Sequence, residues 1–222
     1  MHDRFYPIIQ EYGYAITHEG DADAWNNTPI FYNQEQLELL ESNYNLYMPL
    51  EWSNAKSKSF TSAVFRQKST GKIFGVVSTH LWWKSETAQP GSILARASQV
   101  RLVMAEVEVL KAKYGCPFFV MGDLNSEENT MPIRQLLEGG YQPCYKVATV
   151  RSNFDNGHHE CGPAVIGTRK SNRKSAERQI GAIAHLMIYN AQGTEVKVFD
   201  CIQTAFTVPM TDHYPNLIDA RL

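Results

Sequence analysis

Short apolar runs separated by turn-forming residues constrain this chain more than any other feature of its sequence. Each run is rich in β-branched or aromatic residues and is shorter than a typical helix, which favours β-strands. The runs cover residues 29–33, 37–40, 60–65, 73–79, 117–121, 183–189, 195–199 and 215–222. The run 117–121 is apolar throughout, so we expect it to be a buried strand.

Turns and two helices complete the predicted elements. Residues 68–72 predict a hairpin-type connection, and the turn 190–193 joins two of the later runs. A short helix is expected to follow Thr130 and to end at Gly139 and Gly140. The clearest helix covers 95–114, ends before Gly115 and has one apolar stripe, made of Val100, Val103, Met104, Val107 and Leu110.

Many strands, few helices and no internal repeat or linker predict one α+β domain over residues 1–222, with packed sheets and outer helices. Of the 222 residues, 43% are apolar and 20% are charged, which suits a packed core and excludes a disordered chain. The net charge of −2 argues against a broadly basic surface for nucleic acid. Four cysteines without a Cys-x-x-Cys pair predict neither a zinc site nor a disulfide framework.

No apolar run approaches the roughly 18 residues of a membrane span. The first residues also lack the basic end and apolar run of a signal peptide, so a cytoplasmic location is expected.

Polar motifs lie at the ends of three predicted strands, where a rigid scaffold presents side chains to a cleft. The motifs are Thr79–Leu81, Gly122–Asn125 and Thr211–Pro215. Together they supply imidazoles, carboxylates and a carboxamide, from His80, Asp123, Asn125, Asp212 and His213.

This set of side chains suits phosphoester hydrolysis. A divalent cation neutralises the anionic phosphate and activates water, and magnesium prefers oxygen ligands such as Asp123, Asn125 and Asp212. A histidine accepts a proton from water near neutral pH. Each motif alone also has an ordinary interpretation: a structural histidine, an Asx turn, or a loop that enters an edge strand.

The ordered motifs resemble the endonuclease/exonuclease/phosphatase superfamily, which includes pancreatic deoxyribonuclease, abasic-site nucleases, deadenylases, sphingomyelinases and inositol-polyphosphate phosphatases. The resemblance covers about residues 12–222 and rests on segments 28–33, 78–81, 121–126 and 211–215. It implies an α/β/β/α two-sheet sandwich with outer helices. It also implies magnesium or manganese, and hydrolysis by in-line attack of water.

The resemblance also implies a role for each residue of the motifs. His80 matches the histidine that contacts the scissile phosphate, and His213 matches the histidine that acts as a base or stabilises the phosphorane. Asp123 and Asn125 match the pair that orients the nucleophilic water and the phosphate. Asp212 matches a metal-site aspartate.

Two departures from the family pattern bear on activity. The family begins with two strands, the second ending in a metal-binding Gln-Glu. Here Gln10 and Glu11 run directly into residues 12–14, so we interpret 5–13 as a helix end before a strand and expect those first strands to be missing. The alternative is that Glu11 itself is the metal ligand. Ala184 stands where the family has an aspartate that orients the catalytic histidine, and losing such a carboxylate is severe.

Missing strands would leave sheet edges unpaired and apolar residues uncovered. A chain with such edges is expected to be unstable, to dimerise, or to need a second segment.

Several features bear on the substrate. Trp82 and Trp83 follow His80 and are predicted to stack on bases or sugars, the alternative being that one ring packs in the core. Lys56 and Lys58 could neutralise phosphate, although ordinary surface lysines are expected. The basic segment 169–178 and the histidine pair 158–159 are interpreted as solvated loops.

Two functional hypotheses follow. The first is a metal-dependent phosphoesterase acting on nucleic acid, a nucleotide, a lipid head group or a sugar phosphate. The second, motivated by Ala184 and the missing glutamate, is a weakened member that binds a phosphorylated ligand or a protein partner without turnover. A homo-oligomer is compatible with either hypothesis. The remaining alternative is a globular domain whose motifs are accidental.

Overall fold

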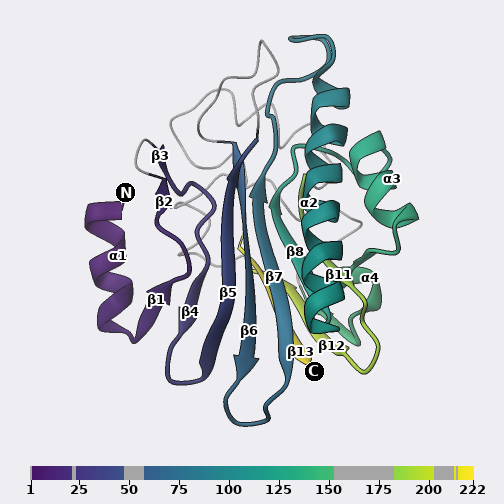
Figure 1. Cartoon of the computed structure of the whole chain (residues 1–222). Helices are drawn as coiled ribbons and strands as arrows, with labels where there is room; N and C mark the ends of the chain where they lie inside the picture. Colours follow the sequence, from purple (N-terminus) through teal and green to yellow (C-terminus); the bar gives the residue numbers. More distant parts are fainter. Residues whose placement is uncertain (1, 22–23, 48–57, 153–182, 203–212, 214) are drawn as a thin grey trace.

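The computed structural model describes residues 2–21, 24–47, 58–152, 183–202, 213 and 215–222. Its centre is a six-stranded sheet (Figure 1). Strands β7 and β8 are parallel, and the other neighbours in this sheet are antiparallel. In spatial order the strands are β5 (Leu37–Leu46), β6 (Ser59–Gln67), β7 (Ile73–His80), β8 (Phe118–Asp123), β11 (Ala184–Tyr189) and β9 (Gln142–Pro143).

Smaller sheets accompany the central one. A three-stranded sheet lies behind it in Figure 1 and consists of β10 (Val150–Ser152), β12 (Glu195–Cys201) and β13 (Asn216–Arg221). Two-stranded pairs are formed by β1 (Tyr14–Ile16) with β4 (Phe31–Asn33), and by β2 (Gly20–Asp21) with β3 (Ala24–Trp25). The helices are α1 (His2–Glu11), α2 (Ser92–Tyr114), α3 (Met131–Glu138) and α4 (Cys144–Val147).

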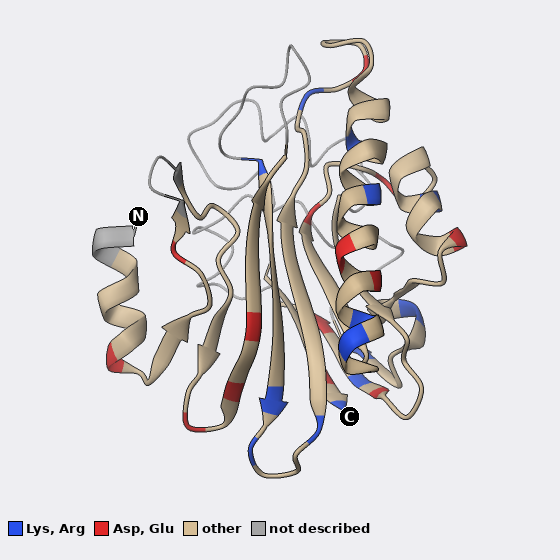
Figure 2. Cartoon of the chain, viewed as in Figure 1, with Lys and Arg blue, Asp and Glu red and all other residues tan. Residues whose placement is uncertain are grey.

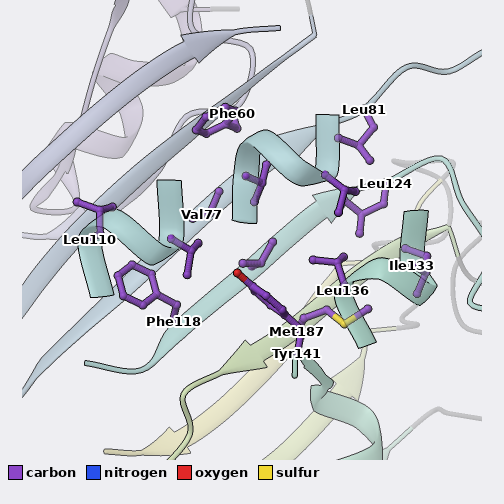
Figure 3. Close-up of a cluster of buried hydrophobic side chains, with 14 of the residues drawn as sticks. Phe60, Val77, Leu81, Leu110, Phe118, Leu124, Ile133, Leu136, Tyr141 and Met187 are labelled. Carbon is purple, nitrogen blue, oxygen red and sulfur yellow. The ribbon is translucent and has the colours of Figure 1, made fainter. Parts of the chain in front are cut away.

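The two faces of the central sheet bury different apolar clusters. Successive side chains of a strand point to opposite faces, so an apolar run can fill both. Phe118 of β8 belongs to the cluster under α2 and α3, which Figure 3 shows, whereas Phe119 belongs to the cluster against β12 and β13. A third cluster joins Phe65 of β6 to the segment around β4. This alternation explains why the run 117–121 is apolar throughout.

Most predicted elements are present in the structure. Helix α2 buries its predicted stripe, with Met104 partly covered, and ends at Gly115 in the left-handed conformation. The hairpin between β6 and β7 closes through the Gln67 amide, which donates to the Lys72 carbonyl. Residues 5–13 do end a helix that leads into a strand, and Glu11 is exposed at the end of α1. The prediction of an α+β two-sheet sandwich is confirmed.

The turn at 190–193 connects elements differently from a hairpin. It leads from β11 in the central sheet to β12 in the three-stranded sheet, so the chain changes layers there.

Figure 2 shows charged residues along α2 and near strand ends, while β6 and β7 are tan over most of their length. In the described part of the chain, no helix has both the length and the apolar character needed to cross a membrane.

Two strands of the smaller sheets, β1 and β13, have one partner each among the described residues. Among the described residues, β1 pairs only with β4, and β13 pairs only with β12. Within the described ranges, the β1–β4 pair and the three-stranded sheet do not join into one sheet, and both pack near Phe74 on the same face of the central sheet.

Candidate active site

The candidate site lies where the parallel strands β7 and β8 end together, at the upper edge of the sheet in Figure 1. Their register sets Thr79 opposite Gly122 and His80 opposite Asp123. Gly122 has φ +139°, and a Cβ added there would lie 1.8 Å from the Thr79 carbonyl oxygen. Glycine therefore permits the close approach of the two strands that brings His80 beside Asp123.

Both predicted histidines face the same carboxylate oxygen. The Nε2 atom of His80 lies 3.4 Å from Oδ2 of Asp123, and Nε2 of His213 lies 3.9 Å from that atom. All three side chains are partly exposed, at 37%, 32% and 23% for His80, His213 and Asp123, so solvent and substrate can reach them. The structure thus brings together three residues that are distant in the sequence.

Asn125 lies in an Asx turn that also fixes the loop. Its backbone amide donates to Oδ1 of Asp123 at 2.9 Å, and its φ of +47° is left-handed. Its side-chain amide donates to the Leu81 carbonyl at 3.2 Å, which ties the residues after β7 to those after β8. The Asx-turn interpretation and a functional Asp123 are therefore compatible, because the turn uses one carboxylate oxygen and the histidines face the other.

Lys58 is a member of this site that the sequence interpretation undervalued. It was expected on the surface, but it is only 6% exposed, because it precedes β6 where that strand lies beside the end of β7. Its Nζ donates to Nε2 of His80 at 2.5 Å. The signal available in the sequence was the antiparallel hairpin, which sets the residues before β6 next to those that end β7.

The charges of this site are coupled. Burial lowers the pKa of the Lys58 ammonium to about 8, although Asp123 favours the charged form. Burial, together with Lys58, also lowers the pKa of His80, while Asp123 acts in the opposite direction. Near neutral pH the lysine is therefore charged, and His80 is held neutral as the acceptor of its hydrogen bond.

The two tryptophans have different positions. Trp82 is 4% exposed, so the prediction that it stacks on substrate is wrong. Its backbone amide donates to Gln99 and its indole donates to Ser92, both on α2, and these bonds hold it in the core. Trp83 is 58% exposed beside it, as expected for a residue able to stack on a ligand.

Arg96 further fixes the segment that carries Trp83. It is buried on α2 and donates hydrogen bonds to the carbonyls of Trp82 and Lys84.

Ala184 lies directly opposite Asp123 in the pairing of β11 with β8. The position expected to hold an orienting carboxylate is thus at the site, and it carries a methyl group.

Several predicted features lie outside the described residues. These are Asp212, Lys56, the histidine pair 158–159 and the basic segment 169–178. Within the described ranges, no cluster of three or more His, Cys, Asp or Glu side chains is arranged to hold a metal ion. The donor types present at the site are nevertheless oxygen atoms of Asp123 and Asn125, which suit magnesium, an ion commonly held by only one or two carboxylates with water and phosphate.

Similarity to solved structures identifies the fold. An endonuclease/exonuclease/phosphatase protein from Bacteroides vulgatus superposes with a TM-score of 0.72 at 20% identity, covering 98% of this chain and 81% of that one. The chain has the fold of the endonuclease/exonuclease/phosphatase proteins. A mannosyl-6-phosphatase from Bacteroides thetaiotaomicron has the same fold, with a TM-score of 0.68, 14% identity and coverage of 98% and 81%.

TDP2 from D. rerio, solved in complex with a single-strand DNA product, also has a similar fold. Its TM-score is 0.63 at 12% identity, with coverage of 98% of this chain and 80% of that one. No protein-family model and no curated protein matches the sequence. The resemblance inferred from the three motifs is therefore supported by the three-dimensional fold, where comparison of sequences alone finds no match.

Proposed function

We propose that this protein hydrolyses phosphoester bonds at the end of β7 and β8. The observation that carries the proposal is the convergence of one buried ammonium, two imidazoles and one carboxylate at a single edge of the sheet. Such a set can bind an anion, move a proton and orient the group that moves it. The fold neighbours include a phosphatase and a protein with a DNA product, which supports this class of chemistry.

Lys58 and His80 form the phosphate-binding part of the proposed mechanism. The Lys58 ammonium, mostly removed from water, attracts a phosphate oxygen more strongly than an exposed lysine would. His80 lies between this cation and Asp123, where its ring can turn from Lys58 to the phosphate. Both groups would stabilise the charge that develops on phosphorus in the transition state.

His213 is the proposed proton-transfer group. Its Nε2 atom faces Asp123 at 3.9 Å, close enough for the carboxylate to stabilise the imidazolium formed when His213 takes a proton from water. Asp123 therefore has two tasks, because its other oxygen holds the Asx turn. Asn125 keeps the two loops together, so that attacking water and phosphate meet in a fixed geometry.

A divalent cation would be held by Asp123 and Asn125 together with Asp212, and it would supply charge neutralisation and a more acidic water. Magnesium or manganese is proposed on the chemistry of these donors.

The substrate is proposed to pair a phosphate with a planar or sugar group. Trp83 is exposed beside the site, and its carrier segment is fixed by Arg96 and Gln99 of α2. An indole held in this way provides a stacking face at little cost in conformational entropy. Nucleotides, single-stranded nucleic acid and sugar phosphates all fit this description.

Ala184 favours a second candidate function. With a methyl group opposite Asp123, the site has no carboxylate from β11 to help orient a histidine. A protein with this defect could bind a phosphorylated ligand or a protein partner with little or no turnover. Lys58 and His80 would still serve such binding, because neither depends on position 184.

One pair of measurements separates these functions. Release of p-nitrophenol from p-nitrophenyl phosphate and from bis-p-nitrophenyl phosphate is followed with and without magnesium, and phosphate binding is followed by calorimetry. The proposal predicts magnesium-dependent turnover that His213→Ala removes and His18→Ala, a histidine elsewhere in the fold, leaves unchanged. Phosphate binding without turnover supports the second function, and neither binding nor turnover would refute both.

A further inference from the structure

Tyr47 directly follows β5 and is buried beside the candidate active site, where the proposed function gives it no task. It is 5% exposed, and its ring packs on Phe60 of β6 with centroids 5.5 Å apart. Its backbone amide donates to the Lys58 carbonyl at 3.0 Å. Its hydroxyl lies 2.5 Å from Oγ1 of Thr79, the residue before His80. Tyr47 therefore bonds to Lys58 itself and to the neighbour of His80.

The side-chain hydrogen bonds of Tyr47 and Thr79 run in one direction. The Thr79 hydroxyl donates to the Ser59 carbonyl at 3.2 Å, which uses its single hydrogen. The bond between the two hydroxyls must therefore be donated by Tyr47. Burial raises the pKa of Tyr47, so its phenol keeps the proton that it donates. The hydroxyl chain Tyr47–Thr79–Ser59 thus joins β5, β6 and β7 at one edge of the sheet.

This hydroxyl chain lies where the pairing of β6 with β7 stops. The last pair is Phe60 opposite Thr79, so the register of these two strands does not extend to Lys58 or His80. Thr79 and Ser59 are 2% and 0% exposed, so water cannot easily replace a lost hydroxyl bond. The hydroxyl chain therefore supplies the contact that fixes the two strand ends on which Lys58 and His80 lie.

We propose that Tyr47 and Thr79 are positioning residues, which hold the Lys58 ammonium on Nε2 of His80. This role rests on the proposed function, in which both groups bind phosphate. Lysine has a flexible four-carbon stem, so its ammonium keeps one position only where its surroundings fix it. With the two strand ends joined, Nζ stays 2.5 Å from the imidazole nitrogen. That nitrogen accepts a hydrogen bond, so neutral His80 carries its proton on Nδ1.

The tautomer of His80 reports this hydrogen bond without any turnover. Nitrogen NMR of the imidazole rings distinguishes a proton on Nδ1 from one on Nε2, and His80→Gln identifies the signal. Spectra are recorded near pH 7 for wild type, Tyr47→Phe, Thr79→Val and Thr79→Ser. Valine has the shape of threonine without the hydroxyl, whereas serine keeps the hydroxyl. Binding of inorganic phosphate to the same proteins is measured by calorimetry.

Tyr141→Phe is the matched control, because it removes a second buried tyrosine hydroxyl. Tyr141 is 2% exposed and lies in the cluster under α2 and α3 (Figure 3). Among the described residues its hydroxyl has no hydrogen-bond partner. Its removal should therefore change neither the His80 tautomer nor the phosphate affinity.

We expect His80 to carry its proton on Nδ1 in wild type, in Thr79→Ser and in Tyr141→Phe. Tyr47→Phe and Thr79→Val should both show a mixture with the Nε2 tautomer, and their phosphate affinity should fall about two- to tenfold, as expected for one lost hydrogen bond. Both changes break the same hydroxyl chain, so combining them should lower the affinity little further. A normal Thr79→Ser spectrum beside an altered Thr79→Val spectrum assigns the effect to the hydroxyl.

A wild-type spectrum with the proton on Nε2 would overturn the proposal, because Lys58 could not then donate to that nitrogen. So would spectra of Tyr47→Phe and Thr79→Val that match wild type. The comparison of Thr79→Val with Thr79→Ser remains decisive if Tyr47→Phe fails to fold. Wild-type protein that neither binds phosphate nor hydrolyses phosphoesters would refute the proposed function, while the spectra would still decide the positioning role.

Discussion

Replacing Lys58 by methionine should make the protein more stable while removing its ability to bind phosphate. Methionine has a similar length and flexibility but no charge. In the folded chain the pKa of Lys58 falls from 10.5 to about 8, mainly through burial. At about 1.36 kcal/mol per pKa unit, the folded state carries a cost of roughly 3 kcal/mol for keeping this group charged at pH 7.

The hydrogen bond from Lys58 to His80 offsets part of that cost. A bond from a charged donor contributes about 1.5 kcal/mol, so Lys58→Met should raise the free energy of unfolding by about 1–2 kcal/mol at pH 7. Because the folded pKa lies below the unfolded one, the cost is present in full below pH 8 and disappears as the pH rises toward 10.5. The advantage of the variant should therefore vanish by about pH 10.

Urea unfolding at both pH values measures this effect, and calorimetry with inorganic phosphate measures the loss of binding. Lys197→Met is the control, because that lysine is 43% exposed and its pair with Glu195, at 3.0 Å, lies on the surface. Its stability should change by less than about 0.5 kcal/mol. The reasoning would be refuted if Lys58→Met were less stable than wild type at pH 7, or if the difference in unfolding free energy between the two did not change with pH.

Three further outcomes are expected. Gly122→Ala should lower the free energy of unfolding by at least about 2 kcal/mol, seen in a urea titration, because the new Cβ would meet the Thr79 carbonyl; an unchanged midpoint would contradict the close approach of β7 and β8. Ala184→Asp should raise turnover at least about tenfold. This increase is small beside the roughly 10⁴-fold effect of an orienting carboxylate in a serine-protease triad. Ala184→Asn, which adds no charge, should not raise turnover in this way. Phosphate affinity should fall above pH 8, as Lys58 loses its proton, and Lys58→Arg should extend binding to higher pH; identical profiles would exclude Lys58 from the site.

The elements with strong periodicity could be predicted from the sequence. Helix α2 has a regular apolar stripe, and β7 and β8 are apolar runs that bury side chains on both faces. The short strands β9 and β10 have no such signal, because pairing with distant strands defines them. The change of layer after β11 is likewise a property of tertiary packing, since the turn residues at 190–193 suit a hairpin equally well.

The site was predictable to the extent that strand ends identify it. His80 and Asp123 were found because polar residues follow buried strands, and the parallel pairing then sets them opposite each other. Lys58 was misjudged because lysine is ordinarily exposed, and only the register of β6 against β7 shows that it is buried. Trp82 was misjudged for a related reason, since hydrogen bonds to α2 draw one of two adjacent indoles into the core.

Turnover of a double variant tests most directly whether these residues act as one catalytic site. Magnesium-dependent hydrolysis of bis-p-nitrophenyl phosphate, or of the monoester if that is the better substrate, is compared in wild type, His80→Ala, His213→Ala and the combination. Residues that serve one transition state are strongly non-additive, so the double variant should be only slightly slower than the slower single variant. Losses that multiply in full would mean that the two histidines act independently, and single variants with wild-type rates would show that this edge of the sheet is not where hydrolysis occurs.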